Sequence, residues 1–382
     1  MNGHFDPRFD ELVALFVEQG AGLPGGSSLA VFQAGEPVVD VWQGEERTGE
    51  AWTAETVSVV FSCTKGLASL VAHRLVEEGR LDLDAPVIQY WPEFAQNGKA
   101  HIPVKWLLQH KAGLSAIRRD LTFDEVIDGH TVEDELAGQE PLWEPGTAHS
   151  YHALTFGTLV GKLVSSVTGI TIGEYFAETI ARPLGVRAWI GLPEPEFDHL
   201  APLVAHPKRG SGTVGTPGSD DYWVSKAMTC GTALDGAVDD VRKGFNNPAL
   251  IRAEIPGAGG VSNARGLAAI YSAAVTETAG IRLLTDKTIR AAMVPQSTGP
   301  MFFEKTGTVF PAWGNGFMVE VPGFVDMLGM GSFGHNGLGG QCAFGDIDHR
   351  LGFAFTTSFL GAGDEEQSRQ QALVRVLRRI LE

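Results

Sequence analysis

Cysteine is scarce in this sequence: its 382 residues include only Cys63, Cys230 and Cys342, which lie far apart. An odd, low count without Cys-x-x-Cys spacing excludes a disulfide framework and a cysteine-based zinc site. Such usage suits a reducing cytosol, so we expect a cytoplasmic protein. Residues 1–6 agree, because they lack the basic start and the apolar segment of an export signal. A chain whose leader has been removed would look the same.

Basic residues are also few, since 29 lysines and arginines face 46 aspartates and glutamates and give a formal net charge of −17. So negative a field excludes binding to a nucleic-acid backbone. Apolar runs fall far short of the roughly 20 residues that a membrane-spanning helix needs. We therefore expect neither nucleic acid nor membrane as a partner. The length and the 43% hydrophobic share instead predict one large domain or two intergrown ones, of unknown oligomeric state.

Two common hydrolase signatures are missing as well. No Gly-x-Ser-x-Gly segment occurs, which removes the nucleophile of an α/β-hydrolase. No His-Glu-x-x-His segment occurs, which removes the ligand set of a zinc hydrolase. We therefore expect no metal and no cofactor. His110 and His152 are interpreted as structural residues and not as members of a Ser-His-Asp triad.

Hydrophobic periodicity and turn residues predict strands near both ends of the chain and helices in its middle. The predicted strands cover residues 27–33, 37–43, 317–321, 341–346 and 351–357. The predicted helices cover residues 6–19, 62–78, 104–110, 121–140, 150–168, 172–180 (ended by Pro183), 267–275 and 367–381, and residues 202–235 predict a long irregular connection. This order predicts an α/β domain formed by residues 1–78 and 252–382, with a mostly helical domain, residues 79–251, inserted and an active site between them.

The segment Phe61 to Gly66 contains Ser62 and Lys65 and joins a β-branched run to an amphipathic one. Apolar residues between 67 and 75 follow a helical period, so Ser62 and Lys65 lie one turn apart on one face of a helix. A serine is a weak nucleophile unless a nearby group takes its proton, and a desolvated lysine does so. The positive end of the helix would favour the alkoxide that forms. From this segment alone, the simpler interpretation is a capping serine beside a solvated lysine.

Two further segments supply the residues that such a nucleophile needs. Pro145 to Tyr151 is a turn that delivers a tyrosine to a predicted helix start, and Phe333 to Gly340 is a glycine-rich entry to a strand that carries His335. Taken singly, Tyr151 is a packing aromatic residue, His335 a loop histidine and the glycines a bulge. Their order along the chain, together with Ser62-x-x-Lys65, favours catalysis.

The three segments together resemble the serine β-lactamase and penicillin-binding superfamily, in particular its class C β-lactamase-like branch and the family VIII carboxylesterases. Leu107 to Leu114 is similar to the Leu-Leu-x-His-x-x-Gly-Leu segment of that branch. The runs 182–185 and 259–262 also match, so that the resemblance spans most of the chain. It implies an antiparallel sheet flanked by helices.

The resemblance also assigns roles to single residues. Ser62 is expected to be the acylated nucleophile, Lys65 its activating partner, and Tyr151 a proton shuttle whose phenolate form is held by the lysine charge. The backbone N–H groups of Ser62 and Leu338 are expected to form the oxyanion hole. The residues expected to contact the substrate are His335, Asn336, Gly337, Trp223 and Trp313; for the two tryptophans, a plain core position is the alternative.

Two departures from the family pattern indicate the substrate. Ala153 stands where the family has an asparagine that holds a β-lactam side-chain amide, and His335 stands where a lysine helps to bind the β-lactam carboxylate. A histidine is mostly neutral at pH 7, so both changes weaken the recognition of an anionic amide. The sequence therefore predicts a carboxylesterase that cleaves small, short-chain esters through an acyl-enzyme on Ser62. The alternatives are a β-lactamase, a D-aminopeptidase, an acyltransferase or transesterase, and a non-catalytic binding relative.

Overall fold

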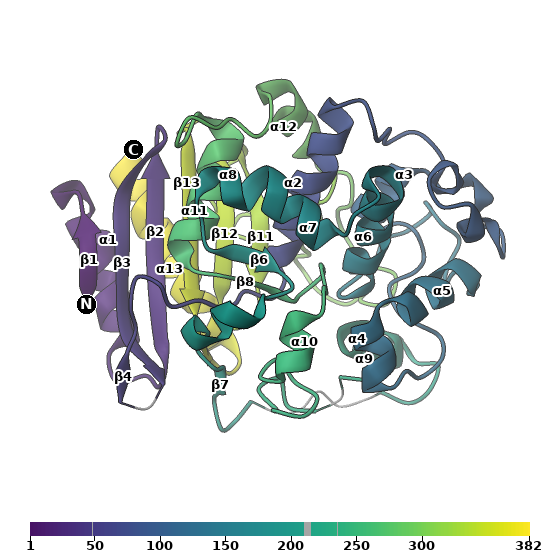
Figure 1. Cartoon of the computed structure of the whole chain (residues 1–382), viewed down its shortest axis with the longest axis horizontal. Coiled ribbons are helices and arrows are strands. Elements are labelled where there is room, and N and C mark those ends of the chain that lie inside the picture. Colours follow the sequence, from purple (N-terminus) through teal and green to yellow (C-terminus); the bar gives the residue numbers. More distant parts are fainter. Residues whose placement is uncertain (48, 210–214, 235) are drawn as a thin grey trace.

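The computed structural model describes residues 1–47, 49–209, 215–234 and 236–382. In this part of the chain, the centre is an antiparallel sheet of nine strands drawn from both ends of the sequence (Figure 1). The order is β1-β3-β2-β13-β12-β11-β10-β9, with β4 beside β3. The bounds are β1 Asn2–Phe5, β2 Gly26–Gln33, β3 Glu36–Arg47, β4 Glu50–Ala51, β9 Ala312–Trp313, β10 Met318–Val319, β11 Ser332–Gly337, β12 Gln341–Asp346 and β13 Leu351–Thr357. The predicted α/β fold with an antiparallel sheet flanked by helices is confirmed.

Helices cover both faces of this sheet, so its central strands are buried on both sides. Alternate side chains of β2 belong to two different hydrophobic cores: Leu29 and Val31 join one, Ala30 and Phe32 the other. The helices that complete the first core are α1 Asp10–Gly20 and α13 Asp364–Leu381, and those of the second are α2 Cys63–Glu77 and α11 Ala264–Val275.

Helix α2 connects the sheet to the remaining helices, because it packs against β11 on one side and against α6 (Thr155–Thr168) on the other (Figure 1). Most of its apolar residues, such as Leu67, are fully buried. Gly66 has no side chain for a reason of space: a Cβ atom there would overlap the hydroxyl of Tyr271 on α11. The N-terminus of α2 therefore lies where the sheet and the helical part of the chain meet.

The middle of the chain is mostly helical, and two small sheets tie it to the ends. Its helices are α3 Val104–Leu108, α4 Phe123–Asp128, α5 His130–Gly138, α6, α7 Ile172–Phe176, α8 Arg182–Leu184, α9 Asp220–Thr229 and α10 Pro248–Arg252, and α12 Asp286–Ala292 follows later. The small sheets are β5 Ser58–Val59, β8 Gly260–Ser262 and β6 Ala188–Ile190, and β7 Val204–Ala205 paired with β14 Phe359–Leu360. The domain boundaries at residues 78 and 252 stay a prediction.

Four local predictions differ from the structure. The predicted helix over residues 121–140 is two helices, α4 and α5, divided at Gly129. The stretch 202–235 is not wholly irregular, since it contains α9, whose first turn is capped by the Ser219 side chain; residues 210–214 and 235 lie outside the described residues. Tyr151 does not open a helix, because α6 begins only at Thr155. Pro183 does not end its helix either. A wide π-type turn at Ala177–Ala181 precedes it, and the helix ends at Gly185 with a φ of 63°.

Within the described residues, no single helix is both long and apolar enough to cross a membrane; only α6 taken with residues 172–184, bent by 74°, meets the length and composition test as a pair.

Candidate active site

Ser62 is held in a constrained turn between β5 and α2. The residue before it, Phe61, adopts a left-handed backbone conformation with a φ of 45°, which is unusual for a bulky aromatic residue. The Phe61 ring packs edge-on against Phe245, with 5.0 Å between the ring centroids. Ser62 takes the N-cap position of α2, but its side chain makes no capping hydrogen bond. The hydroxyl is therefore not used to terminate the helix.

The structure brings the predicted hydroxyl, amine and phenol together. Lys65 Nζ lies 3.2 Å from Ser62 Oγ, and the Tyr151 hydroxyl donates a hydrogen bond of 2.8 Å to the same oxygen. Lys65 Nζ also donates to the backbone carbonyls of Ala153 and Gly257, each at 2.6 Å. Both neighbours of the Ser62 hydroxyl are thus groups that exchange protons.

The environment of Lys65 favours a free amine. Its side chain is fully buried, and burial lowers the pKa of Lys65 well below its ordinary value. A free amine has two N–H donors and one lone pair, and the two carbonyls accept both donors. The lone pair is left for the Ser62 hydroxyl, which is the arrangement that a general base requires.

Tyr151 is clamped between two flat side chains. Its ring stacks on Trp313, with centroids 5.5 Å apart, and on His335, with centroids 6.0 Å apart. Burial raises the pKa of Tyr151, although Lys65 Nζ lies 4.8 Å from the ring centroid. This direction opposes the resting phenolate that the family resemblance implied. It favours Tyr151 as a donor of a proton.

His335 is neutral in this structure. Its Nδ1 atom faces the backbone carbonyl of Asn336 at 2.7 Å, and a carbonyl only accepts, so Nδ1 carries the proton. Nε2 is therefore an unprotonated acceptor, and it is buried without a hydrogen-bond partner among the residues that the structure describes. Burial lowers the pKa of His335 to about 3. The position where the family has a lysine thus adds no charge at neutral pH.

The turn that carries Tyr151 is fixed by two buried histidines. The backbone N–H of His152 donates to His110 Nδ1, and the N–H of Ser150 donates to the His110 carbonyl. His152 in turn accepts at Nε2 from the Leu114 N–H and donates from Nδ1 to the Ser150 carbonyl. His110 and His152 therefore hold the Tyr151 turn in place by hydrogen bonds to its backbone, in line with the structural interpretation.

We expect acid to destabilise the protein, because five buried histidines, at positions 73, 110, 149, 152 and 335, have pKa values that burial lowers. In the unfolded chain these histidines have the ordinary pKa of 6.5 and take up protons below that pH, which the folded chain does not. Their contribution to the free energy of unfolding is therefore complete above pH 6.5, and it is lost as the pH falls toward their pKa values in the folded state. The pKa is about 4 for His152 and about 3 for His335, so these two residues alone cost about 2 kcal/mol each at pH 5.

Urea unfolding at pH 7.5 and pH 5.0 measures this effect as a fall in the free energy of unfolding. The exposed His130 offers a matched control, since His130→Asn should change the free energy little at either pH. Equal free energies at the two pH values in the wild-type protein would contradict the expectation.

The predicted oxyanion hole consists of the backbone N–H groups of Ser62 and Leu338. In the part of the chain that the structure describes, neither the Ser62 nor the Leu338 N–H donates a hydrogen bond to a protein acceptor. Leu338 follows Gly337 at the end of β11. A Cβ atom at Gly337 would lie 2.5 Å from the Val60 carbonyl, so glycine allows β11 to approach the Ser62 turn closely.

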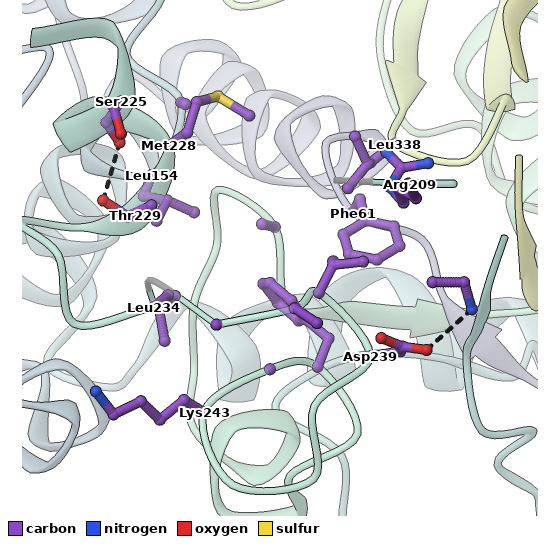
Figure 2. Close-up of a pocket in the computed structure, with 18 of the residues that line it drawn as sticks. Phe61, Leu154, Arg209, Ser225, Met228, Thr229, Leu234, Asp239, Lys243 and Leu338 are labelled. Atoms are coloured by element: carbon purple, nitrogen blue, oxygen red, sulfur yellow. Dashed lines mark hydrogen bonds between the residues drawn. The ribbon is translucent and has the colours of Figure 1, made fainter. Parts of the chain in front are cut away.

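Two cavities meet at Ser62. The larger chamber, of about 880 Å³, has Phe61, Ala153 and Leu154 in its wall (Figure 2). The smaller chamber, of about 440 Å³, is lined by Tyr151, Trp313, His335, Asn336, Gly337 and other residues. Ser62, Met228 and Leu338 line both chambers, so the nucleophile stands at their junction.

Trp223 lines neither chamber. It lies on α9 and stacks on Phe303, and it borders a separate cavity of about 100 Å³ that also reaches Tyr151. Trp313, by contrast, is buried and forms part of the wall of the smaller chamber. The structure thus brings one of the two candidate tryptophans to the substrate cavities.

Cys63, the neighbour of Ser62, is not a competing nucleophile. Its side chain is fully buried and its thiol donates to the His335 carbonyl at 3.2 Å. Burial raises the pKa of Cys63 to about 12, so the reactive thiolate is absent at neutral pH.

Sequence reasoning missed several residues of the site. The carbonyls of Ala153 and Gly257 hold Lys65, yet backbone atoms carry no side-chain signature. Met228 lines both chambers, and Glu304 lines the smaller one. Both belong to stretches without a motif. For Met228 the long connection 202–235 was a signal, since such connections are often functional, and for Glu304 there was none.

An antiparallel sheet covered by helices, with Ser-x-x-Lys at the start of a helix beneath it, defines the β-lactamase and transpeptidase class of fold. The family model described as Beta-lactamase matches residues 9–377, and the chain belongs to this family. The resemblance inferred from the motifs is thereby confirmed.

Three proteins similar to this chain have names that indicate esterases or penicillin-binding proteins. The protein described as esterase/beta-lactamase LipL of Mycobacterium tuberculosis is 33% identical over 380 residues, which cover 92% of this chain and 81% of that protein. A crystal structure of a family VIII carboxylesterase is 30% identical, covers 98% of both chains and superposes with a TM-score of 0.85. A penicillin-binding protein homologue of Caulobacter crescentus is 31% identical, covers 99% of both chains and superposes with a TM-score of 0.88.

Proposed function

We propose that this protein is a carboxylesterase that cleaves short-chain esters through an acyl-enzyme on Ser62. The observation that carries the proposal is the double contact of Ser62 Oγ, with Lys65 Nζ at 3.2 Å and the Tyr151 hydroxyl at 2.8 Å, at the junction of two cavities. A binding module has no need of a nucleophile with a base and an acid on either side. The relative named as an esterase/beta-lactamase and the family VIII carboxylesterase support the same class of reaction.

In the proposed mechanism, the Lys65 amine takes the proton of the Ser62 hydroxyl while Oγ attacks the ester carbonyl carbon. The negative charge on the carbonyl oxygen is stabilised by the N–H groups of Ser62 and Leu338. When the C–O bond to the alcohol breaks, the leaving oxygen takes the proton of Tyr151. The Lys65 ammonium then returns a proton to Tyr151, which restores both groups. In the second half, the same pair takes a proton from water while the water oxygen attacks the acyl carbon. The bond between that carbon and Ser62 Oγ then breaks, and the pair returns the proton to Oγ, which restores the Ser62 hydroxyl.

The proposed preference for esters without an anionic group over β-lactams has two structural supports. His335 carries no charge, so the position that would face a substrate carboxylate offers no cation. Ala153 has no side-chain amide, and its carbonyl is occupied by Lys65. A β-lactam would lose both contacts, whereas a small ester needs neither.

The direct test is hydrolysis of p-nitrophenyl acetate and butyrate, followed by labelling with a serine-reactive phosphonate and mapping of the adduct by peptide mass. We expect ester turnover and a single adduct on the peptide that contains Ser62. Failure to cleave any p-nitrophenyl ester from acetate to octanoate, or an adduct on another serine, would overturn the proposal.

His335→Lys tests the substrate preference. A lysine there adds a cation to the smaller chamber, so we expect the ratio of nitrocefin to p-nitrophenyl butyrate turnover, measured as kcat/KM, to rise roughly tenfold. His335→Gln is the matched neutral control and should leave the ratio near that of the wild type. A ratio that does not move in the lysine variant would refute the role given to this position.

A further inference from the structure

The position of Tyr151 determines which chamber receives the leaving alcohol, and this step rests on the proposed function. Tyr151 lines the smaller chamber and does not belong to the wall of the larger one. The leaving oxygen must lie beside the Tyr151 hydroxyl to take its proton. The alcohol therefore occupies the smaller chamber, and the acyl chain extends into the larger one.

The smaller chamber has an aromatic wall. Besides Tyr151 and Trp313, the rings of Phe310 and Phe324 line it. The sulfur-containing side chains of Met228, Met301 and Met318 also line this chamber. The faces of aromatic rings carry partial negative charge and attract cations within about 6 Å of the ring centre. Such a wall favours a neutral or a positively charged group over an anion.

The formal charge among the residues that line the smaller chamber is negative. Among the described residues that line the smaller chamber, Glu304 is the only one with a formal charge at slightly alkaline pH, because burial keeps His335 and Tyr151 neutral. Glu304 is exposed to solvent, and partial burial of its carboxyl group raises its pKa from the ordinary value. Its charged neighbour Lys305 lies instead over the ring of Phe302 and toward Asp220.

The larger chamber differs in this respect. Its wall contains charges of both signs, with Arg209 and Lys243 as well as Asp221 and Asp239 (Figure 2). A selection by the sign of charge is therefore a property of the smaller chamber alone. The net charge of −17 adds a weaker, general attraction for cations, which salt screens.

We propose that the smaller chamber selects the alcohol by charge, and that the substrates of this protein are esters whose alcohol carries a positive charge, such as amino-alcohol or quaternary-ammonium esters. Glu304 and the two described rings of this wall that stack on no other ring of the site, those of Phe310 and Phe324, recognise the cation. Glu304 is thus a specificity-determining residue, and it takes no part in the chemical step.

Three thioesters with the same butyryl group test the proposal at pH 8, with thiol release as the readout. They are butyrylthiocholine, its neutral isostere 3,3-dimethylbutyl thiobutyrate, and the anionic S-butyryl-3-mercaptopropionate. We expect kcat/KM for the wild-type protein to fall in that order, with the cation roughly tenfold above the neutral isostere. In Glu304→Gln this ratio should fall to about two, and in Glu304→Lys the order should reverse.

Glu178→Gln is the matched control, because Glu178 is exposed and lines neither chamber. It makes the same change of net charge, so its cation-to-neutral ratio should equal that of the wild type. Equal rates for the cation and its isostere in the wild type, or an unchanged ratio in Glu304→Gln, would overturn the charge selection while leaving the esterase proposal intact. No cleavage of any thioester or p-nitrophenyl ester would overturn both proposals.

Discussion

Ser62→Ala is expected to abolish ester hydrolysis, with kcat for p-nitrophenyl butyrate lower by about 10⁴ or more. The reason is that no other group at the junction of the two chambers can form the acyl-enzyme. Cys63 is buried and its thiol has a pKa of about 12. Burial also raises the pKa of Tyr151, so its phenol stays protonated. A variant without the hydroxyl keeps the cavities and the oxyanion donors but has no atom to acylate.

The measurement compares purified wild type, Ser62→Ala and Ser165→Ala under the same conditions. Ser165 is a suitable control because it lies on α6 away from both chambers and its hydroxyl bonds only the Lys162 carbonyl of its own helix. The control should retain wild-type turnover, and the phosphonate adduct should vanish only in Ser62→Ala. Equal turnover in Ser62→Ala and the wild type would remove the nucleophile from the mechanism.

The prediction of Ser62 and Lys65 from the sequence succeeded geometrically because it needed only local information. Two residues three positions apart on a helix share a face whatever the rest of the fold does, and α2 does begin at Cys63. The hairpin of β2 and β3 was equally accessible, because Gly35 with a φ of 94° supplies the turn that two alternating strands require.

Tyr151 shows where local reasoning fails. Its convergence on Ser62 came from the order of the motifs, and the predicted helix start at this position is wrong. The turn is held open by hydrogen bonds to His110, which lies about 40 residues earlier and has a φ of 58°. Hydrophobic periodicity predicts one amphipathic helix over residues 150–168. It takes no account of a histidine from another part of the chain that accepts a backbone hydrogen bond.

The electrostatics of the site was still less accessible. The low pKa of Lys65 follows from complete burial. Its amine is held in place by the carbonyls of Ala153 and Gly257, which are 88 and 192 residues away along the chain. Glu304 reaches the smaller chamber from a loop without any motif. The ionisation and position of such groups depend on which backbone atoms and loops the fold brings together. The residue types alone do not determine them.

Lys65→Met is expected to lower kcat by about 10³, because methionine fills the space of the lysine stem and removes the base. Lys65→Arg separates two possible roles. If lysine served only as a positive charge that holds Tyr151 as a phenolate, arginine would preserve much of the activity. Since burial lowers the pKa of Lys65 and raises that of Tyr151, we expect a base instead, and arginine, which stays protonated, should be as inactive as methionine.

The pH profile gives the same test in the wild-type protein. A general base must be unprotonated, so kcat/KM should rise with pH through the pKa of Lys65, which lies well below its ordinary value of 10.5. Lys162→Met on α6, where the lysine pairs with Glu133 outside both chambers, is the control and should keep the wild-type profile. Substantial activity in Lys65→Arg would instead assign the protonated lysine and the Tyr151 phenolate to the resting enzyme.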